Sequence, residues 1–328
     1  MRLFALPRFP LTVLPTPLQR AMRLEAALGP ASPRIFIKRD DLTGLAFGGN
    51  KARKLEYLVA DALAQGATML ITEGAAQSNH ARMTAAAAAL AGLRCELVLD
   101  ARHGADVAGN LLLDRLLGAT IHIVPDKQAR VARMAELAES LPARGERPYL
   151  IPTGGSVPLG AAGYVTAVLE LLGQLMAAGV SPRRLYFATS SLGTQAGLVV
   201  GARLFAAPFR IYGIAVEHPR ETLVAKGVDL ANATAALLGV DERFTAADIA
   251  IDDGFVGEAY GVRTPEGLAA IQLLARTEAI LLDPVYSGKA MSALIAHIRA
   301  GEFSPDDAVL FLHTGGGPSL FAHGTALL

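Results

Sequence analysis

The chain has 328 residues, 52% of them hydrophobic and 18% charged, which excludes a disordered chain and suits two domains with large buried cores. Lys and Arg together number 30, as do Asp and Glu, which excludes the strong basic field that holds nucleic acid or an anionic membrane. The single cysteine, Cys95, excludes a disulfide within the chain, and the seven histidines lack the spacing of a zinc site.

The amino-terminal region lacks the pattern of a signal peptide. Four prolines interrupt its first 18 residues, and there is no small-residue cleavage site. The longest apolar stretch, residues 185–207, contains hydroxyl, amide and arginine side chains, which favour a buried strand and helix over a membrane span. We therefore expect a cytoplasmic protein that binds neither membrane nor nucleic acid.

Short apolar runs alternate with longer helical patterns in the first half of the chain. The apolar spacing predicts strands over residues 34–41, 68–72, 95–100 and 120–124. Helical periodicity, aided by five consecutive alanines, predicts helices over residues 51–65, 79–90, 110–117 and 127–141. This alternation is typical of a parallel sheet with helices on its faces.

The second half repeats the pattern, so we predict an α/β protein. Its expected strands are residues 149–152, 185–189, 211–217, 279–283 and 308–314. Its expected helices are residues 161–178, 194–206, 220–238, 266–277 and 289–299. Glycines recur every four residues from 193 to 201, which predicts that this helix packs closely against the sheet.

Ligands of parallel α/β sheets bind in the loops after the strands, and five such loops have unusual composition. Lys51 follows a glycine pair in FGGNK, although a turn with a surface lysine also explains that loop. Residues 73–82, EGAAQSNHAR, carry more polar groups than helix capping requires. Residues 188–197, ATSSLGTQAG, form a candidate phosphate cup. Structural turns also explain the other two loops, residues 283–290 and 313–319.

A nucleotide-dependent dehydrogenase is the alternative from a different class. Glu217 ends the strand after the candidate cup, where the ribose-binding acid of a dinucleotide fold would stand. However, the G-x-G-x-x-G pattern is missing, because Gly193 is the only glycine before the helix. A lysine in a glycine turn together with a separate phosphate cup instead favours Schiff-base chemistry on pyridoxal phosphate. The role of Glu217 stays open.

The chain resembles the D-cysteine desulfhydrase / 1-aminocyclopropane-1-carboxylate deaminase family, which are pyridoxal-phosphate enzymes of the tryptophan-synthase β-subunit-like fold, fold type II. The matching segments run in order along nearly the whole chain: LPTPL, IKRDDLTGLAFGGNKARKLEYL, QSNHAR, PTGGSVPLGAAGYV, GTQAGLVVG, YGVRTPEG, ARTEAILLDPVYSGKAMSALI and HTGGGPSLF. The resemblance implies a homodimer of two-domain chains, each domain a mostly parallel twisted sheet with helices on both faces. A large cofactor-binding domain would comprise residues 1–48 and 164–328, and a small domain residues 49–163.

The resemblance also implies the roles of individual residues. Lys51 is expected to form the Schiff base with the cofactor, and Asn79 to hydrogen-bond its phenolic oxygen. The phosphate cup is expected to comprise Ser191, Leu192, Gly193 and Thr194, helped by Lys54. The substrate carboxylate is expected at Ser78, Asn79 and His80. Tyr260 and Tyr286 are expected to flank the substrate and the cofactor.

Two positions favour desulfhydrase activity within this family. Cyclopropane deaminases resemble DPVYEGK and HLGG, whereas this chain has Ser287 and Thr314 in place of Glu and Leu. A glutamate keeps the pyridine nitrogen protonated, as a difficult ring opening requires, whereas the Ser287 hydroxyl favours a neutral nitrogen, which is adequate when sulfide leaves. Thr314 supplies a second hydroxyl near the ring or the leaving group. The expected substrate is D-cysteine.

Other substrates of the same fold stay open. L-Cysteate, D-serine and β-chloro-D-alanine are alternatives for elimination, and racemisation shares the removal of the Cα proton. Ser287 disfavours cyclopropane deamination, and the intact Lys51 disfavours a binding protein without turnover. Leu192 is bulkier than the small residue usual in the cup, and the segment after Leu99, DARHGADVAGN, is several residues shorter than in typical relatives. That segment is expected to edge the active site.

Overall fold

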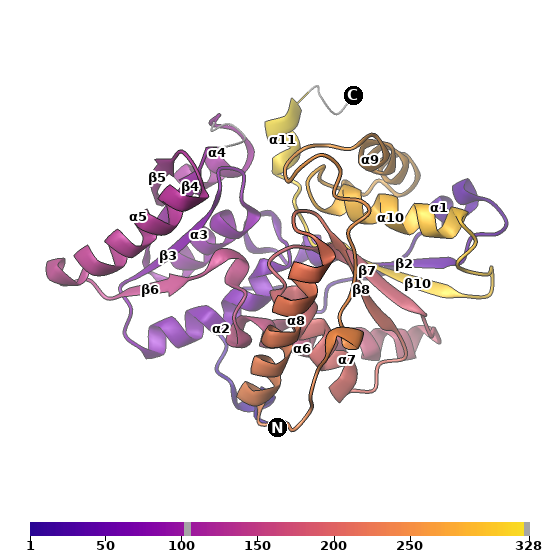
Figure 1. Ribbon diagram of the computed structural model, residues 1–328, viewed down its shortest axis with the longest axis horizontal. Coiled ribbons are helices and arrows are strands. Elements are labelled where there is room, and N and C mark those ends of the chain that lie inside the picture. Colours follow the sequence, from indigo (N-terminus) through magenta and orange to yellow (C-terminus); the bar gives the residue numbers. More distant parts are fainter. Residues whose placement is uncertain (102–105, 325–328) are drawn as a thin grey trace.

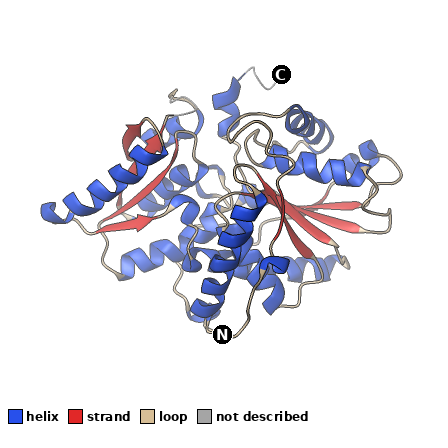
Figure 2. Cartoon of the chain, in the orientation of Figure 1, coloured by secondary structure: helices blue, strands red, loops and turns tan. Residues whose placement is uncertain are grey.

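Two separate β-sheets form the framework of the molecule, as the computed structural model shows in Figures 1 and 2. The structure describes residues 1–101 and 106–324. The smaller sheet lies on the left of Figure 1 and the larger on the right, with helices around both. The predicted α/β class with two sheets is therefore confirmed. Part of the shortened segment after Leu99, residues 102–105, lies outside the described residues.

The larger sheet has six strands and combines both ends of the chain. Its strands lie in the order β1 (Leu18–Arg20), β2 (Arg34–Lys38), β10 (Ala308–Leu312), β7 (Arg184–Thr189), β8 (Arg210–Ala215) and β9 (Ala250–Asp252). Only the pairing of β1 with β2 is antiparallel among the described pairs of this sheet. All five residues of β10 are buried, as expected for a central strand covered on both faces.

The smaller sheet has four parallel strands from the first half of the chain. They lie in the order β5 (Thr120–Val124), β4 (Arg94–Asp100), β3 (Met69–Ala75) and β6 (Pro148–Ile151). The two sheets therefore draw on residues 18–38 with 184–312, and on residues 69–151. The exact domain limits at residues 48/49 and 163/164 stay a prediction.

The helices fall where the sequence periodicity predicts them, with small changes at their ends. Ser78 caps the alanine-rich helix α3 by accepting a hydrogen bond from the Ala81 N–H, and Thr264 caps α9 by accepting from Gly267. The helices are α1 (Met22–Leu28), α2 (Lys51–Ala64), α3 (Asn79–Ala91), α4 (Gly109–Leu116), α5 (Lys127–Ser140), α6 (Pro158–Ala178), α7 (Gly193–Leu204), α8 (Arg220–Leu238), α9 (Pro265–Glu278), α10 (Ser287–Arg299) and α11 (Ser319–His323). The short elements α1, α11, β1 and β9 were not predicted.

The predicted strand over residues 279–283 is wrong. Ala279 ends α9 with a left-handed φ of 55°, and the chain then runs in irregular structure to α10. Ile280 and Leu282 are buried and Leu281 is exposed, which reproduces the alternation of a strand. The Leu281 carbonyl, however, accepts a hydrogen bond from the His313 ring at 3.0 Å, and no described strand pairs with this segment.

The glycines of α7 bring it close to another helix, whereas the sequence predicted close packing against the sheet. A Cβ atom on Gly197 would overlap the Ala161 carbonyl oxygen of α6, and one on Gly201 would lie 2.8 Å from a Val168 methyl of α6. The spacing therefore serves the contact between α6 and α7.

Helix α6 is, by length and composition alone, long and apolar enough to cross a membrane. It packs against α2, α7 and α8, and half of its most apolar stretch is buried inside the protein. Its buried residues, from Gly160 to Leu175, belong to the hydrophobic core under the larger sheet. This is the position of a core helix.

Candidate active site

A pocket of about 640 Å³ lies where the carboxyl ends of strands from both sheets meet. The smaller sheet contributes the loops after β3 and β6, and the larger sheet contributes the loops after β7, β8 and β10. The start of α2, one face of α8, and two tyrosines complete the wall. Its lining includes Lys51, Ser78, Asn79, His80, Ser191, Leu192, Thr194, Tyr260, Tyr286 and Thr314, so the structure brings most of the predicted site residues together.

Lys51 is the first residue of α2 and presents an activated amine to the pocket. Its Nζ donates a hydrogen bond to Asn50 Oδ1 at 3.1 Å, and the Asn50 Nδ2 donates in turn to Thr194 Oγ1 at 3.0 Å. Burial and then the Arg82 charge lower the pKa of Lys51, Asp283 partly opposes both, and the resulting pKa is about 8. About a tenth of this amine is therefore unprotonated at pH 7 and about half at pH 8, in the form that attacks an aldehyde.

The turn between β7 and α7 forms an anion cradle. Leu192 adopts a left-handed φ of 68°, and α7 begins at Gly193 without a side-chain cap. The Gly193 N–H donates to Ser156 Oγ at 3.1 Å, which in turn donates to Ser191 Oγ at 2.9 Å. Leu192 offers no side-chain cap to the N–H groups that follow Gly193, and these groups together with the dipole of a 12-residue helix favour an anion at this end.

Lys54 supplies the positive charge behind this cradle. Its Nζ donates to the Gly154 carbonyl at 3.0 Å, and a Cβ on Gly193 would lie 2.7 Å from the same nitrogen. Burial, and then the charge of Lys51, lower the pKa of Lys54 well below its usual range. A bound phosphate would restore that charge, because an opposite charge favours the protonated amine. The amine fits the aldehyde of pyridoxal phosphate, and the anion cradle in the same pocket fits its phosphate.

The loop after β3 places Ser78, Asn79 and His80 at the start of α3. Asn79 Oδ1 accepts a hydrogen bond from Asn110 at 2.9 Å. Thr72 donates its hydroxyl hydrogen to the Ile151 carbonyl, so the His80 Nε2 must donate to Thr72 Oγ1 at 2.9 Å. Burial, with the charges of Lys51 and Lys54, lowers the pKa of His80 well below its usual range, so this imidazole is neutral. Binding of a substrate carboxylate here stays a prediction.

Tyr260 and Tyr286 lie together on the opposite wall. Their hydroxyls are hydrogen-bonded to each other, with ring centroids 6.0 Å apart. Burial raises the pKa of Tyr260 to about 12 and that of Tyr286 well above its usual range. Both phenols therefore stay protonated at physiological pH and can act as hydrogen-bond donors.

The comparisons with known proteins agree with this geometry. Residues 10–315 match the family model described as "Pyridoxal-phosphate dependent enzyme". The chain belongs to this family. The D-cysteine desulfhydrase of Serratia proteamaculans is 43% identical over 98% of this chain and 97% of its own. That of Klebsiella pneumoniae is 44% identical over 97% of this chain and 96% of its own.

Solved structures give the same family and fold. A crystal structure of an ACC deaminase homologue is 38% identical, covers 99% of this chain and 98% of its own, and has a TM-score of 0.90. A pyridoxal 5'-phosphate-dependent aspartate racemase, at 17% identity and a TM-score of 0.67 over 92% of this chain and 90% of its own, shares the fold. This pyridoxal-phosphate-dependent enzyme thus has the type II fold that the sequence predicted.

Ser287 has a partner in this enzyme that the sequence did not predict. Its hydroxyl donates to Asp283 Oδ1 at 2.6 Å and accepts from the Asp283 N–H at 2.8 Å. The same carboxylate accepts hydrogen bonds from the N–H groups of Val285, Tyr286 and Ser287. Ser287 is buried and is absent from the described lining of the pocket, whereas Thr314 lines it. The DP sequence that opens this turn was the available signal for Asp283.

Two further residues of the site, Asn50 and Ser156, were missed, whereas Ser190 lies in the predicted cup loop and Glu217 was noted without a role. Asn50 and Ser156 hold Lys51 and the cradle, as described above. Ser190 donates to Glu217 Oε2 at 2.8 Å, and both line the pocket. Ser156 lies in a motif that carried the resemblance, but nothing in the sequence alone places it 37 residues away against Gly193.

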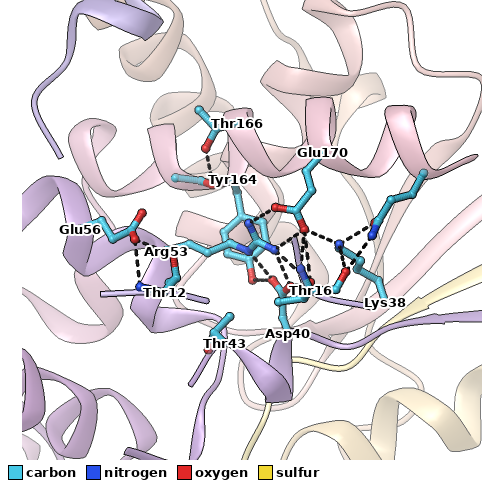
Figure 3. Close-up of polar contacts among 12 residues, drawn as sticks. Thr12, Thr16, Lys38, Asp40, Thr43, Arg53, Glu56, Tyr164, Thr166 and Glu170 are labelled. Atoms are coloured by element: carbon cyan, nitrogen blue, oxygen red, sulfur yellow. Dashed lines mark hydrogen bonds and ion pairs between the residues drawn. The ribbon is translucent and has the colours of Figure 1, made fainter. Parts of the chain in front are cut away.

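A buried ionic network around Arg53 anchors α2 (Figure 3). The Arg53 guanidinium donates two hydrogen bonds to Asp40, both at 2.8 Å, and two to Glu170, at 2.9 and 3.0 Å. Lys38 pairs with Glu170, and the Tyr164 hydroxyl donates to Asp40 at 2.6 Å. The network ties α2 to β2 and α6, so the helix that carries Lys51 and Lys54 has a fixed position.

Proposed function

We propose that this enzyme is a D-cysteine desulfhydrase, which converts D-cysteine and water to pyruvate, ammonia and hydrogen sulfide. The observation that carries the proposal is the activated Lys51 amine beside an anion cradle in one pocket. The names of the relatives that are 43–44% identical over nearly the whole chain support D-cysteine as the substrate.

Different residues would have different roles in the β-elimination. Bound pyridoxal phosphate supplies an aldehyde for the substrate amine and a ring that withdraws electrons from Cα. The cradle at Gly193 and Lys54 would hold its phosphate. Lys51 would then act as the base that takes the Cα proton, for which a pKa of about 8 is well matched. The Cβ–S bond breaks, sulfur leaves as HS⁻, and the released aminoacrylate hydrolyses to pyruvate and ammonia.

Substrate recognition would come from the two opposite walls of the pocket. Ser78, Asn79 and His80 would receive the carboxylate at the amino terminus of α3, where helix N–H groups favour an anion. The protonated phenols of Tyr260 and Tyr286 would face the leaving sulfur, and while they stay bonded to each other one of them would donate a hydrogen bond to it as its negative charge develops. Thr314 would lie on the ring side of the cofactor, and Ser287 would lie behind the described pocket lining with its hydroxyl bonded to Asp283.

A substrate panel tests the proposal directly. D-Cysteine, L-cysteine, L-cysteate, D-serine and aminocyclopropane carboxylate are each incubated with the cofactor-loaded enzyme, and 2-oxo acid and sulfide are measured. We expect equal amounts of pyruvate and sulfide, with D-cysteine the best substrate by kcat/KM. A higher kcat/KM for L-cysteate with release of sulfite, or for aminocyclopropane carboxylate with 2-oxobutyrate, would contradict it.

The assembly and the location of the enzyme are part of the proposal. The family resemblance supports a homodimer, and the single buried Cys95 suits the reducing cytoplasm. Light scattering of the purified protein at several concentrations would measure a mass of twice 34.2 kDa if the dimer is correct. A mass of one chain at every concentration would contradict it.

A further inference from the structure

The turn that precedes Lys51 has an unfavourable backbone conformation. Ala46 and Phe47 have positive φ angles of 41° and 69°, which L-residues other than glycine rarely adopt. Gly48 follows at 66°, where a Cβ would overlap the Asp41 carbonyl oxygen. Left-handed φ brings the Cβ of an L-residue close to the following carbonyl oxygen, so two adjacent residues of this kind are unfavourable. This turn therefore needs partners that hold it in place.

The guanidinium of Arg82, a residue of helix α3, provides such partners. Its Nη1 donates to the Ala46 carbonyl, and its Nη2 donates to the Gly48 carbonyl at 3.1 Å. The side chain is fully buried and is the largest of the fully buried side chains among the described residues. The two fork nitrogens thus bind the carbonyls on either side of Phe47, within five residues of Lys51.

No described carboxylate forms an ion pair with Arg82. Asp114 of α4 acts on it electrostatically, but both Asp114 carboxylate oxygens and the Arg82 Nε lack hydrogen-bond partners among the described residues. Burial raises the pKa of Asp114 to about 8. The buried guanidinium therefore has backbone carbonyls as its direct partners and keeps its positive charge near Lys51.

We propose that Arg82 is a positioning residue for Lys51: its guanidinium clamps the left-handed turn at residues 46–48 and so delivers the Lys51 amine into the pocket in the orientation that captures the cofactor. Other supports of the turn are the Thr43 side chain, which bonds both the N–H and the carbonyl of Gly49, and the Thr314 carbonyl, which accepts from Asn50. Arg82 differs from these two supports because its side chain is charged. The proposal rests on the assignment of Lys51 as the cofactor lysine.

The charge of Arg82 gives the proposal a readout that a packing role would not share. The charged groups that act on Lys51 are Arg82 of α3 and Asp283 before α10, and Lys51 acts in turn on Lys54 of α2 and His80 of α3. Removing the Arg82 cation should raise the pKa of Lys51, since desolvation alone then opposes its protonation. Lysine at position 82 keeps a charge but lacks the fork that binds two carbonyls.

The experiment compares Arg82→Met and Arg82→Lys with the wild type and with Asp114→Asn. Asp114 lies in the same buried cluster but has no bond to the turn, so Asp114→Asn reports the effect of disturbing the cluster itself. Pyridoxal phosphate is added to cofactor-free protein, capture is followed by absorbance, and borohydride reduction with peptide mapping assigns it to Lys51. The pH midpoint of Lys51 is measured by competitive acylation of the cofactor-free chain.

We expect capture to slow on the order of 10- to 100-fold in both Arg82 variants, because misplacement of about 1 Å has effects of this size. Asp114→Asn should capture at the wild-type rate. The Lys51 midpoint should rise in Arg82→Met and stay near the wild-type value in Arg82→Lys. If Arg82→Met does not fold, the capture rate of Arg82→Lys alone tests the proposal.

Wild-type capture rates in the folded Arg82 variants would overturn the proposal, as would equal slowing in Asp114→Asn. A lower melting temperature with unchanged capture and midpoint would indicate a structural role only. These readouts do not involve D-cysteine, so they can fail or succeed independently of the proposed desulfhydrase activity.

Discussion

Lys51 and Lys54 lie one helical turn apart, and burial depresses the pKa of both amines, yet their environments differ. Lys51 faces an amide oxygen and the open pocket, whereas Lys54 faces a carbonyl and the start of α7. Two lysines of one helix are thereby separated into a nucleophile and an anion partner. Each assignment leads to a substitution with its own signature.

Replacing Lys51 by alanine should remove the covalent attachment of the cofactor. We expect loss of the borohydride-stable adduct and a fall in the rate of sulfide release of at least about 10³-fold, because both the amine and the base are lost. Absorbance, peptide mapping and a sulfide assay measure these effects. Wild-type turnover of D-cysteine by Lys51→Ala would exclude Lys51 as the catalytic lysine.

Replacing Lys54 by methionine should weaken cofactor binding and leave capture chemistry intact. The loss of one charge-assisted contact with a phosphate corresponds to on the order of 10- to 100-fold in Kd. In the wild type, phosphate binding should also weaken as pH rises, because the depressed pKa of Lys54 requires proton uptake on binding. Calorimetry with inorganic phosphate in buffers of different ionisation enthalpy checks this. A Kd unchanged by both pH and substitution would contradict the role.

At the scale of elements, the packing of α3 against α4 leads to a prediction about how stability depends on pH. Asp114 is fully buried, and its pKa is raised from 3.8 to about 8. The folded state therefore binds a proton that the unfolded state has released between these two values. The contribution of this group to stability is fully present below pH 3.8 and is lost as pH rises to about 8.

Asp114→Asn should remove this pH dependence. The loss from Asp114 at pH 7 is on the order of 4 kcal/mol, so the variant should unfold at higher denaturant concentration than the wild type near pH 8 and similarly near pH 4. Urea unfolding at several pH values measures the difference. Parallel pH profiles for variant and wild type would show that Asp114 is ionised in the folded protein.

Substitutions in the ionic network around Arg53, which anchors α2, should be among the most destabilising in the protein. Arg53→Met would leave Asp40 and Glu170 as buried charges without their shared partner, at a cost on the order of 3–5 kcal/mol. A matched control is Arg133→Met on the surface of α5, whose exposed pair with Glu136 should change urea unfolding little because solvent screens it. Equal effects of the two substitutions on urea unfolding would contradict a stabilising network.

Local patterns allowed the elements to be predicted, whereas contacts across the chain did not follow from them. Ser78 before five alanines and Thr264 before Pro265 are cap signals that the sequence displays directly. The segment at residues 279–283 alternates like a strand because its neighbours bury two of its side chains, and periodicity alone does not reveal whether a strand lies beside it.

The residues of the site divide in the same way: local sequence marks some of them, and only contacts with distant parts of the chain reveal the others. Lys51, Thr194 and Ser78 lie in loops whose composition marked them, and the structure brings them to one pocket. Arg82, Ser156 and Asp283 were not recognised, because their roles depend on partners such as the Ala46 and Gly193 backbone. An arginine close to five consecutive alanines on one predicted helix was a signal in the sequence that could have been used.

At the scale of the whole molecule, the pocket takes its walls from both sheets, so ligand binding and stability are linked. The cofactor binds the folded chain and not the unfolded one, so at 100 times its Kd it should add about 2.7 kcal/mol to the free energy of unfolding. Removing it should lower the melting temperature by several degrees, as calorimetry can measure. Equal melting temperatures with and without cofactor would indicate that the pocket does not close around it.

The side chain of Asn50 joins the two ends of the pocket, since its oxygen accepts from Lys51 and its nitrogen donates to Thr194. Its orientation is thereby determined, because the lysine can be met only by the oxygen. If Lys51 bonded with an aldehyde, the amide would lose this donor and would polarise less strongly toward Thr194. Through this single amide, the covalent state of the lysine would affect the hydrogen bonding of Thr194 at the start of α7.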